Sequence, residues 1–531
     1  MAPKKFENML MEINGFGLFQ IFVVTLLAIP RIFLSCHLLL NNFIAALPPH
    51  RCDISNLHNG LFRNVTVEQE LIVSTPVRGD GTRKPCEMFA EPQFGLLANG
   101  SNITDLQTMP CQNGWIYDNS TFTSTIATEW DLVCDRKSLA NTSTTIFFMG
   151  VMVGSIILGY LSDKYGRKNT LFVASVMAVV FGFSSALANS FILFVVLRFL
   201  TGVGLAGVPN NTMVLSIEWV DIGHRALISV IGGLSWCAGL MLLPAVAFLT
   251  RDWRTLVMAV TAPLGLTLLT FWWIPESARW LLVNGEVERA QFYLDRCAKF
   301  NKRPKLSSDL ILDTLSDMKI MEEQSKGYTY LDLIKTPKMR KLTVLTGILW
   351  FGVGFTYYGL SFNILDFGLN LYVTHFVFAA IEVPFRMMTY WFLGAVGRRR
   401  CQAGSLLLTG ICIAANMFVP TGLWYVRAAV AIFGKGLAGF SFTAVYLYTA
   451  ELYPTILRQR GMGYTSFLCR VGVSVAPLIL LLGDVWPALP HIIFCFGVFL
   501  SGLLCLLLPE TLNAKLPETI DDIEKPRSVN K

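Results

Sequence analysis

Several arginines interrupt long apolar stretches of this sequence, where ionisable side chains are rare and costly. Arg470 lies near the middle of the stretch 462–483, and the flanking residues include no acid. A guanidinium can hold a carboxylate through two parallel hydrogen bonds. Arg470 is therefore the leading candidate for recognising an anionic ligand. The alternative is an arginine that is hydrogen-bonded to a neighbouring helix.

Each of the other intramembrane cations has a structural explanation beside a functional one. Arg386 follows Glu382 at helical i, i+4 spacing, so the two can pair along one helix face instead of binding a ligand. Arg31 follows Pro30, which frees a backbone carbonyl one turn earlier; Arg31 can bond that carbonyl or line a cavity. Lys435 lies between two glycines, where close helix packing competes with a ligand role.

Aromatic side chains in the same stretches can hold a flat organic molecule by stacking and apolar burial. The candidates are Tyr357, Tyr358, Phe442, Tyr446 and Trp236. Polar groups in the first stretch, five residues apart, can add hydrogen bonds: His37 and Asn42. Together with the cations, they predict a small amphipathic anion with an aromatic or flat body as the ligand.

The composition places these residues in a membrane protein. The chain has 531 residues, of which 53% are hydrophobic and 15% charged, whereas soluble domains carry about 25% charged residues. This excludes a soluble enzyme, a disordered scaffold and a nucleic-acid binder. A span needs about 20 apolar residues, and we predict twelve: 17–40, 145–162, 170–189, 191–215, 226–249, 254–274, 342–364, 370–395, 402–420, 424–449, 462–483 and 488–508.

Loop charges predict the orientation, because Lys and Arg gather on the cytoplasmic side. The basic loops 163–169, 397–400 and 275–341 all fall on one side, together with both termini. Residues 48–144 then form one large outer loop. Its cysteines predict two disulfides among three possible pairings: Cys52, Cys86, Cys111 and Cys134. Its predicted glycosylation sites are Asn64, Asn99, Asn102 and Asn119.

Three charged landmarks of the first half recur 231 to 234 residues later. This spacing predicts two six-helix halves in tandem, with a substrate site between them and alternating access. We expect ion pairs among the landmark residues to hold the cytoplasmic side shut; anchoring and topology setting are the alternative. The residues concerned are Asp163, Arg167, Glu218, Arg225, Glu276, Arg398, Glu451, Arg458 and Glu510.

The expected segments are a cytoplasmic N-terminus (1–16), a first six-helix half (17–274), a cytoplasmic linker (275–341), a second half (342–508) and a cytoplasmic tail (509–531). The fold class is all-α membrane. The sequence contains no Walker loop, HExxH or GxSxG motif. We therefore expect no enzymatic activity, no ATP-driven transport, and neither metal nor cofactor.

Four stretches carry a family resemblance: GYLSDKYGRKNTL (159–171), STIATEWDLVCD (124–135), PESARWLL (275–282) and ELYPTILRQRGMG (451–463). The first resembles the major facilitator loop between helices 2 and 3. The others resemble the organic anion and cation transporters of solute carrier family 22. Within that family, the stretch 29–31, His37 and 277–282 are most similar to one anion-transporting branch.

The resemblance implies a twelve-helix major facilitator fold with a large outer loop between helices 1 and 2. It also implies that anion transporters carry Arg at the position of Arg470, where cation transporters carry Asp. It further supports Arg386, Tyr357, Tyr358, Phe442 and Asn42 as cavity residues. The predicted function is a polyspecific organic anion transporter of the plasma membrane, working by uniport or by exchange against small carboxylates. Transport of organic cations or zwitterions by the same fold, and a receptor with a glycosylated outer loop, are the alternatives.

Overall fold

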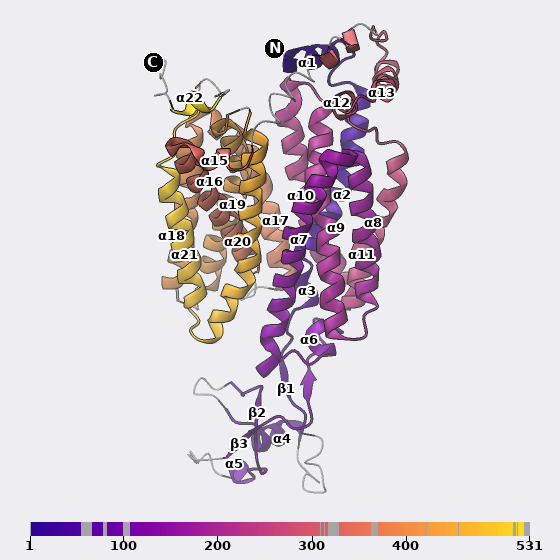
Figure 1. Ribbon diagram of the computed structural model, residues 1–531. Helices are drawn as coiled ribbons and strands as arrows, with labels where there is room; N and C mark the ends of the chain where they lie inside the picture. Colours follow the sequence, from indigo (N-terminus) through magenta and orange to yellow (C-terminus); the bar gives the residue numbers. More distant parts are fainter. Residues whose placement is uncertain are drawn as a thin grey trace.

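The computed structural model describes residues 2–54, 66–77, 82–98, 107–307, 310–312, 314–316, 329–362, 370–420, 422–454, 456–512, 514, 517 and 519–524. Long helices run roughly parallel in two groups, with a small domain at one end (Figure 1). We call the end that carries this domain the loop face. The opposite end, where both chain termini lie, is called the termini face.

Among the described residues, eleven helices are long and apolar enough to cross a membrane, and one further apolar helix is shorter; twelve spans stay a prediction. In the first half the long helices are α2 (Leu18–Leu39), α7 (Lys137–Tyr165), α8 (Arg167–Ala186), α9 (Phe191–Glu218), α10 (Arg225–Thr250) and α11 (Trp253–Leu266), which continues as η4 (Thr267–Trp272). In the second half they are α16 (Pro337–Phe362), α17 (Leu371–Ala395), α18 (Arg398–Phe418), α19 (Trp424–Leu452), α20 (Arg458–Leu481) and the short α21 (Leu489–Cys505). Short helices extend or join them: α3 (Asn41–Ile44), η2 (Cys134–Arg136), η3 (Ile222–His224) and η6 (Leu482–Asp484).

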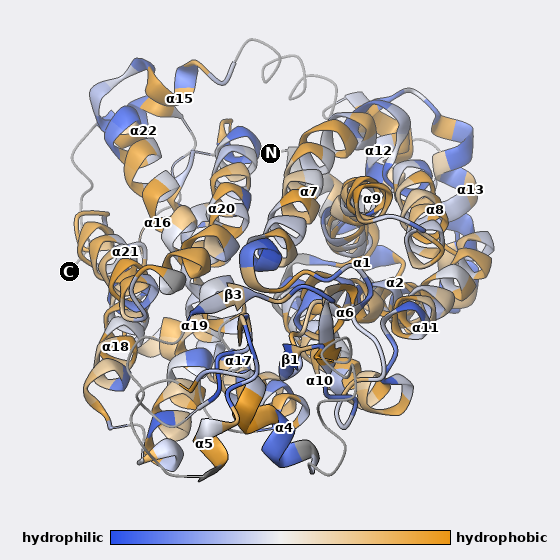
Figure 2. Cartoon of the chain, turned by 90° about the horizontal axis from the view of Figure 1, so that it is seen from below, coloured by the Kyte–Doolittle hydropathy of each residue, from blue (hydrophilic) through white to orange (hydrophobic). Residues whose placement is uncertain are grey.

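Viewed along the bundle, the two groups lie side by side, and apolar residues dominate the helices (Figure 2). Small residues let neighbouring helices approach closely, as is common in membranes where the helices gain little from hydrophobic burial. A methyl group on Gly154 of α7 would lie 2.4 Å from the carbonyl oxygen of Val203 on α9. The glycine therefore fixes how closely these two helices pack.

The loop-face domain contains two small antiparallel sheets. Strand β1 (His50–Cys52) pairs with β4 (Trp115–Tyr117), and β2 (Glu87–Phe89) pairs with β3 (Thr108–Pro110). Three short helices accompany them: α4 (Val67–Ser74), α5 (Gly95–Ala98) and α6 (Ile126–Glu129).

Two disulfides close this domain, one between Cys52 and Cys111 and one between Cys86 and Cys134. This is one of the three pairings that the sequence left open. Helix α7 begins at Lys137, inside the range 48–144 that we expected to be loop. The predicted glycosylation site Asn119 is exposed, while Asn64, Asn99 and Asn102 lie outside the described residues.

Short helices cover each half separately at the termini face (Figure 1). Helices α1 (Ala2–Glu12), α12 (Ala278–Val283) and α13 (Val287–Phe300) lie over the first half. Asn301, which follows α13, donates hydrogen bonds to the backbone oxygen of Ile13 at 3.0 Å and to Gln20 Oε1 at 2.9 Å. Helices α15 (Asp332–Lys335) and α22 (Ile520–Glu524) lie over the second half, where the Lys338 backbone N–H donates to Glu524.

The recurring landmarks form the same local structure in both halves. Gly166 and Gly397 have φ values of 98° and 102° and precede the first residues of α8 and α18. Glu276 Oε1 accepts a hydrogen bond from the Arg167 backbone N–H at 3.0 Å, and Glu510 Oε1 accepts one from that of Arg398 at 2.8 Å. Each carboxylate thus satisfies N–H groups at a helix N-terminus, where negative charge is favourable.

The ion pairs at the termini face join helices of the same half. Arg167 lies 3.6 Å from Glu218 and 3.1 Å from Asp163, and Arg398 lies 3.1 Å from Glu451. Arg225 and Arg458 are the first residues of α10 and α20. The role of these residues in closing the cytoplasmic side stays a prediction. In this structure the named pairs consolidate each half.

The two capping carboxylates differ in their electrostatics. Burial raises the pKa of the Glu276 carboxyl above its ordinary value, although backbone hydrogen bonds oppose that rise. Burial acts in the same direction on Glu510, but hydrogen bonds from the backbone of Leu512, Thr511 and Arg398 outweigh it and lower its pKa. The ionised cap is therefore held more firmly in the second half.

We expect Gly397→Ala to lower the unfolding temperature of the detergent-purified protein. Gly397 has φ 102° and ψ 154°, a conformation essentially restricted to glycine that costs other residues about 1–3 kcal/mol, and the new methyl group would lie 2.6 Å from a Glu510 oxygen. Gly404→Ala is the matched control, because nothing lies within 4 Å of its methyl position on the same helix. An equal effect of both substitutions would contradict the capping geometry.

Candidate functional site

The two halves touch at mid-height and toward the loop face. Asn42 Nδ2 of the first half donates to the Ser361 carbonyl of the second at 2.8 Å. Tyr372, at the start of α17, stacks on Phe43 with ring centroids 5.6 Å apart. Its hydroxyl donates to the Thr121 carbonyl at 3.2 Å. These contacts close the bundle at the loop face, so Asn42, expected to bind ligand, holds the halves together here.

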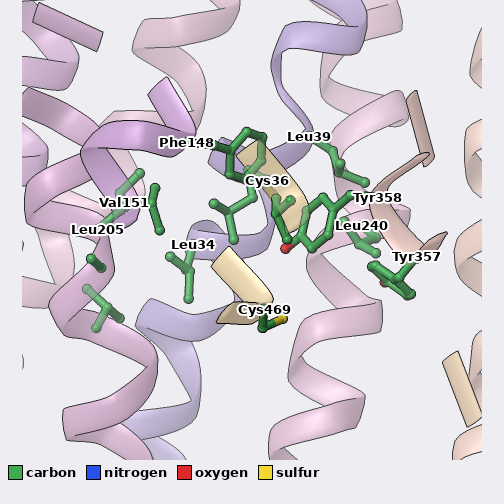
Figure 3. Close-up of a cluster of buried hydrophobic side chains, with 14 of the residues drawn as sticks. Leu34, Cys36, Leu39, Phe148, Val151, Leu205, Leu240, Tyr357, Tyr358 and Cys469 are labelled. Carbon is green, nitrogen blue, oxygen red and sulfur yellow. The ribbon is translucent and has the colours of Figure 1, made fainter. Parts of the chain in front are cut away.

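Aromatic rings continue this contact toward the middle of the bundle. Phe148 of α7 lies 5.3 Å from Tyr358 of α16, centroid to centroid. Figure 3 shows Tyr357 and Tyr358 among Leu39, Leu240 and Cys469, which come from α2, α10 and α20. Both tyrosines are buried. Tyr357 and Tyr358, two of the predicted aromatic residues, therefore lie at the interface between the halves.

Arg470 carries an uncompensated charge in α20. Its Nε atom is buried without a hydrogen-bond partner, and no carboxylate among the described residues lies within 4 Å of the guanidinium. The Tyr358 and Tyr446 hydroxyls are near enough to interact with it electrostatically. An unpaired guanidinium among aromatic rings is the arrangement expected for recognising an anion.

Tyr446 marks the point where cations from both halves converge. Its hydroxyl interacts electrostatically with Arg31 of α2, Arg386 of α17 and Arg470 of α20. The Tyr446 ring packs edge-on against Trp350 at 4.6 Å and lies 6.0 Å from Phe442. The site thus combines positive charge with an aromatic wall.

Arg31 is the contribution of the first half to this group. Its Nη1 lies 3.7 Å from Met213 Sδ, so the hydrogen bond that we find goes to sulfur and not to a carbonyl freed by Pro30. A small cavity of about 10 Å³ beside it is lined by residues that include Ser216 and Gly232. No ion pair with a described carboxylate neutralises Arg31.

Arg386 is, by contrast, paired. Arg386 Nη2 lies 2.8 Å from Glu382 Oε2, as the i, i+4 spacing predicts. Lys435 of α19 approaches the other oxygen, with Nζ 3.2 Å from Glu382 Oε1. The lysine, for which the sequence left close packing and a ligand role open, is therefore part of a buried charge cluster formed by Glu382, Arg386 and Lys435. We call this cluster the Glu382 triad.

A hydrogen-bond chain connects the triad to the first half. Trp236 Nε1 of α10 donates to the Tyr357 hydroxyl at 3.0 Å, and that hydroxyl donates to Glu382 Oε1 at 2.8 Å. Trp236 and Tyr357, predicted as stacking surfaces, are thus also polar links between the halves.

His37 does not join the site. It is fully buried within the first half, where Nε2 lies 3.4 Å from the Thr261 hydroxyl and its carbonyl accepts from Arg198. In this conformation the His37 ring is packed inside the first half with Nδ1 lacking a hydrogen-bond partner among the described residues, and a ligand role for it stays a prediction. Trp350, Phe148 and Tyr372 also lie at the candidate site and were not predicted, because an aromatic residue in a span carries no local sign of which way it faces.

Comparisons with known proteins identify the family. The profile of the Major Facilitator Superfamily matches residues 119–477. Solute carrier family 22 member 7 (organic anion transporter 2) is 43% identical in Sus scrofa and 42% in Homo sapiens, over 98% of this chain and 96% of each relative. Solute carrier family 22 member 6-B of Xenopus laevis is 38% identical over 98% of this chain and 95% of its own length.

Solved structures support the fold. The xylose transporter XylE from E. coli, in a partially occluded inward open conformation, superposes with a TM-score of 0.61 at 14% identity. That match covers 93% of this chain and 98% of the XylE chain. The major facilitator fold expected from the sequence is confirmed.

We expect Tyr357→Phe to destabilise the purified protein by about 1–2 kcal/mol, because it removes the acceptor of the Trp236 N–H and one donor to the buried Glu382. Tyr358→Phe is the matched control on the adjacent residue, since we find no hydrogen bond from the Tyr358 hydroxyl to the described residues. Thermal unfolding of both variants checks the prediction. It fails if Tyr358→Phe costs as much as Tyr357→Phe.

Proposed function

This chain belongs to the major facilitator superfamily and, within it, to solute carrier family 22, and from that premise we propose that it carries small organic anions across the plasma membrane. The substrate has one or more anionic groups on a flat or aromatic body. Transport is facilitated uniport or exchange against another small anion, such as a dicarboxylate, and is not driven by ATP.

The observation that carries this proposal is the unpaired guanidinium of Arg470. Holding a charge inside a membrane protein without a partner is costly, so a partner that arrives with the substrate accounts for its presence. Arg31 adds a second cation from the opposite half, which gives the empty site an excess of positive charge. A cationic substrate would be repelled by both.

The aromatic residues would bind the flat, apolar part of the substrate. Phe442 is half-buried and Tyr446 is exposed, and buried Trp350 packs edge-on against both rings, so a flat apolar group gains from burial and ring contacts there. Such a surface tolerates different ring systems, since burial is not directional. Polyspecificity toward amphipathic anions follows.

The contacts between the halves at the loop face indicate which entrance to the proposed site is closed. We infer that the loop face is extracellular, that both termini are cytoplasmic, and that this structure has its extracellular entrance closed by Asn42, Phe43 and Tyr372. Rocking of one half against the other would separate these groups and open the site to the outside. The ion pairs at the termini face connect helices of the same half, so each half would move as a rigid unit.

The first test is uptake into cells that express the chain. We expect uptake of labelled phenylacetate but not of phenyltrimethylammonium, a cation of similar ring size. Arg470→Asp is expected to lower the initial rate of phenylacetate uptake at least tenfold, since it replaces the attracting charge with a repelling one.

Surface biotinylation verifies that each variant reaches the plasma membrane. Arg340→Gln is the control, because Arg340 is an exposed arginine near the start of α16, and we expect uptake to remain within twofold of the native rate. Uptake of the ammonium compound by the native chain, unaffected by Arg470→Asp, would overturn the proposal in favour of cation transport.

A further inference from the structure

The Glu382 carboxylate is divided between two cations that differ in accessibility. Oε2 accepts from Arg386 Nη2 at 2.8 Å and from Arg386 Nε at 3.2 Å. Oε1 lies 3.2 Å from Lys435 Nζ and accepts from the Tyr357 hydroxyl at 2.8 Å. The Glu382 side chain itself is 0% exposed. Both oxygens are thus occupied, each by a different partner.

Lys435 cannot serve as a direct ligand for a transported anion in this arrangement. Its side chain is 2% exposed, and Nζ lies 3.3 Å from the centre of the Tyr357 ring. Nζ also donates to the Ser361 hydroxyl at 2.5 Å. The lysine is therefore committed to α16 and Glu382.

Arg386 is the accessible member of the triad. Its side chain is 12% exposed, and Nη1 donates to Thr443 at 3.0 Å. A methyl group on Gly233 of the opposite half would lie 3.5 Å from Arg386 Cδ. Arg386 also interacts electrostatically with Arg31 and with Tyr446. It thus faces the group of cations proposed to bind substrate.

We propose that Glu382 is a positioning residue that competes with the transported anion for Arg386, and that Lys435 decides the outcome by holding the Glu382 carboxylate. This inference rests on the proposed function. In the empty site Glu382 neutralises Arg386. When an anion binds, Arg386 turns its donors to the anion, while Glu382 remains on Lys435 and Tyr357.

Arg386 can turn from Glu382 to the anion because each buried charged group keeps a partner throughout. Removing a partner from a buried ion strongly destabilises it, whereas exchanging one partner for an equivalent one costs little. Lys435 and Tyr357 keep two contacts on Glu382 after Arg386 has turned away. The arriving anion supplies the guanidinium with the acceptors that it loses.

Two substitutions that both remove the ion pair between Glu382 and Lys435 are expected to have opposite effects on substrate binding. Glu382→Gln removes the competitor and is expected to lower the Kd for phenylacetate three- to tenfold. Lys435→Gln leaves Arg386 as the one cation of the triad beside Glu382 and is expected to raise that Kd by a similar factor. The Kd is measured by isothermal titration calorimetry on the full chain in lipid nanodiscs.

Phenylacetamide, which has the same body without the charge, serves as the neutral probe, and its binding is expected to be unchanged in both variants. Weaker phenylacetate binding in both variants, or equal changes for the two probes, would assign the triad a merely structural role and overturn the proposal. If Glu382→Gln does not fold, Lys435→Gln alone decides, since unchanged or tighter binding contradicts the competition. A native chain that binds no phenylacetate would instead overturn the proposed function.

Discussion

The buried ion pairs of Glu382 are the interaction on which the centre of this protein depends. Inside a membrane protein an isolated carboxylate is prohibitively costly, so Arg386 and Lys435 must both stay near it. The consequence is that α17 and α19 are tied together by charge. Tyr357 extends the tie to α16, and Trp236 extends it to the first half.

Buried carboxylates also need partners at the termini face, where backbone N–H groups take the place of cations. Glu276 and Glu510 place their carboxylates on the backbone N–H groups that begin α8 and α18. Two glycines with positive φ let the chain turn tightly enough for this contact. Each half is thereby consolidated by its own carboxylate, and these capping contacts do not join one half to the other.

The central site is defined by the contrast between compensated and uncompensated cations. Arg386 and Lys435 share one acid, whereas Arg31 and Arg470 have no carboxylate partner among the described residues. The net positive charge therefore lies where the two halves face each other. The anionic substrate that we propose would bridge them, and its binding energy would act on the proposed equilibrium between two arrangements of the halves.

The sequence by itself determined the helices, the repeat and the pair of Glu382 with Arg386, because apolar length, charge spacing and i, i+4 geometry are local properties. It also singled out Arg470, since a charge in a span is visible without a fold. Only the tertiary structure decided the disulfide pairing, the inclusion of Lys435 in the triad, and the diversion of Asn42 and His37 to structural contacts. These depend on which faces of different helices meet, and in an all-apolar helix the sequence carries little information about which face that is.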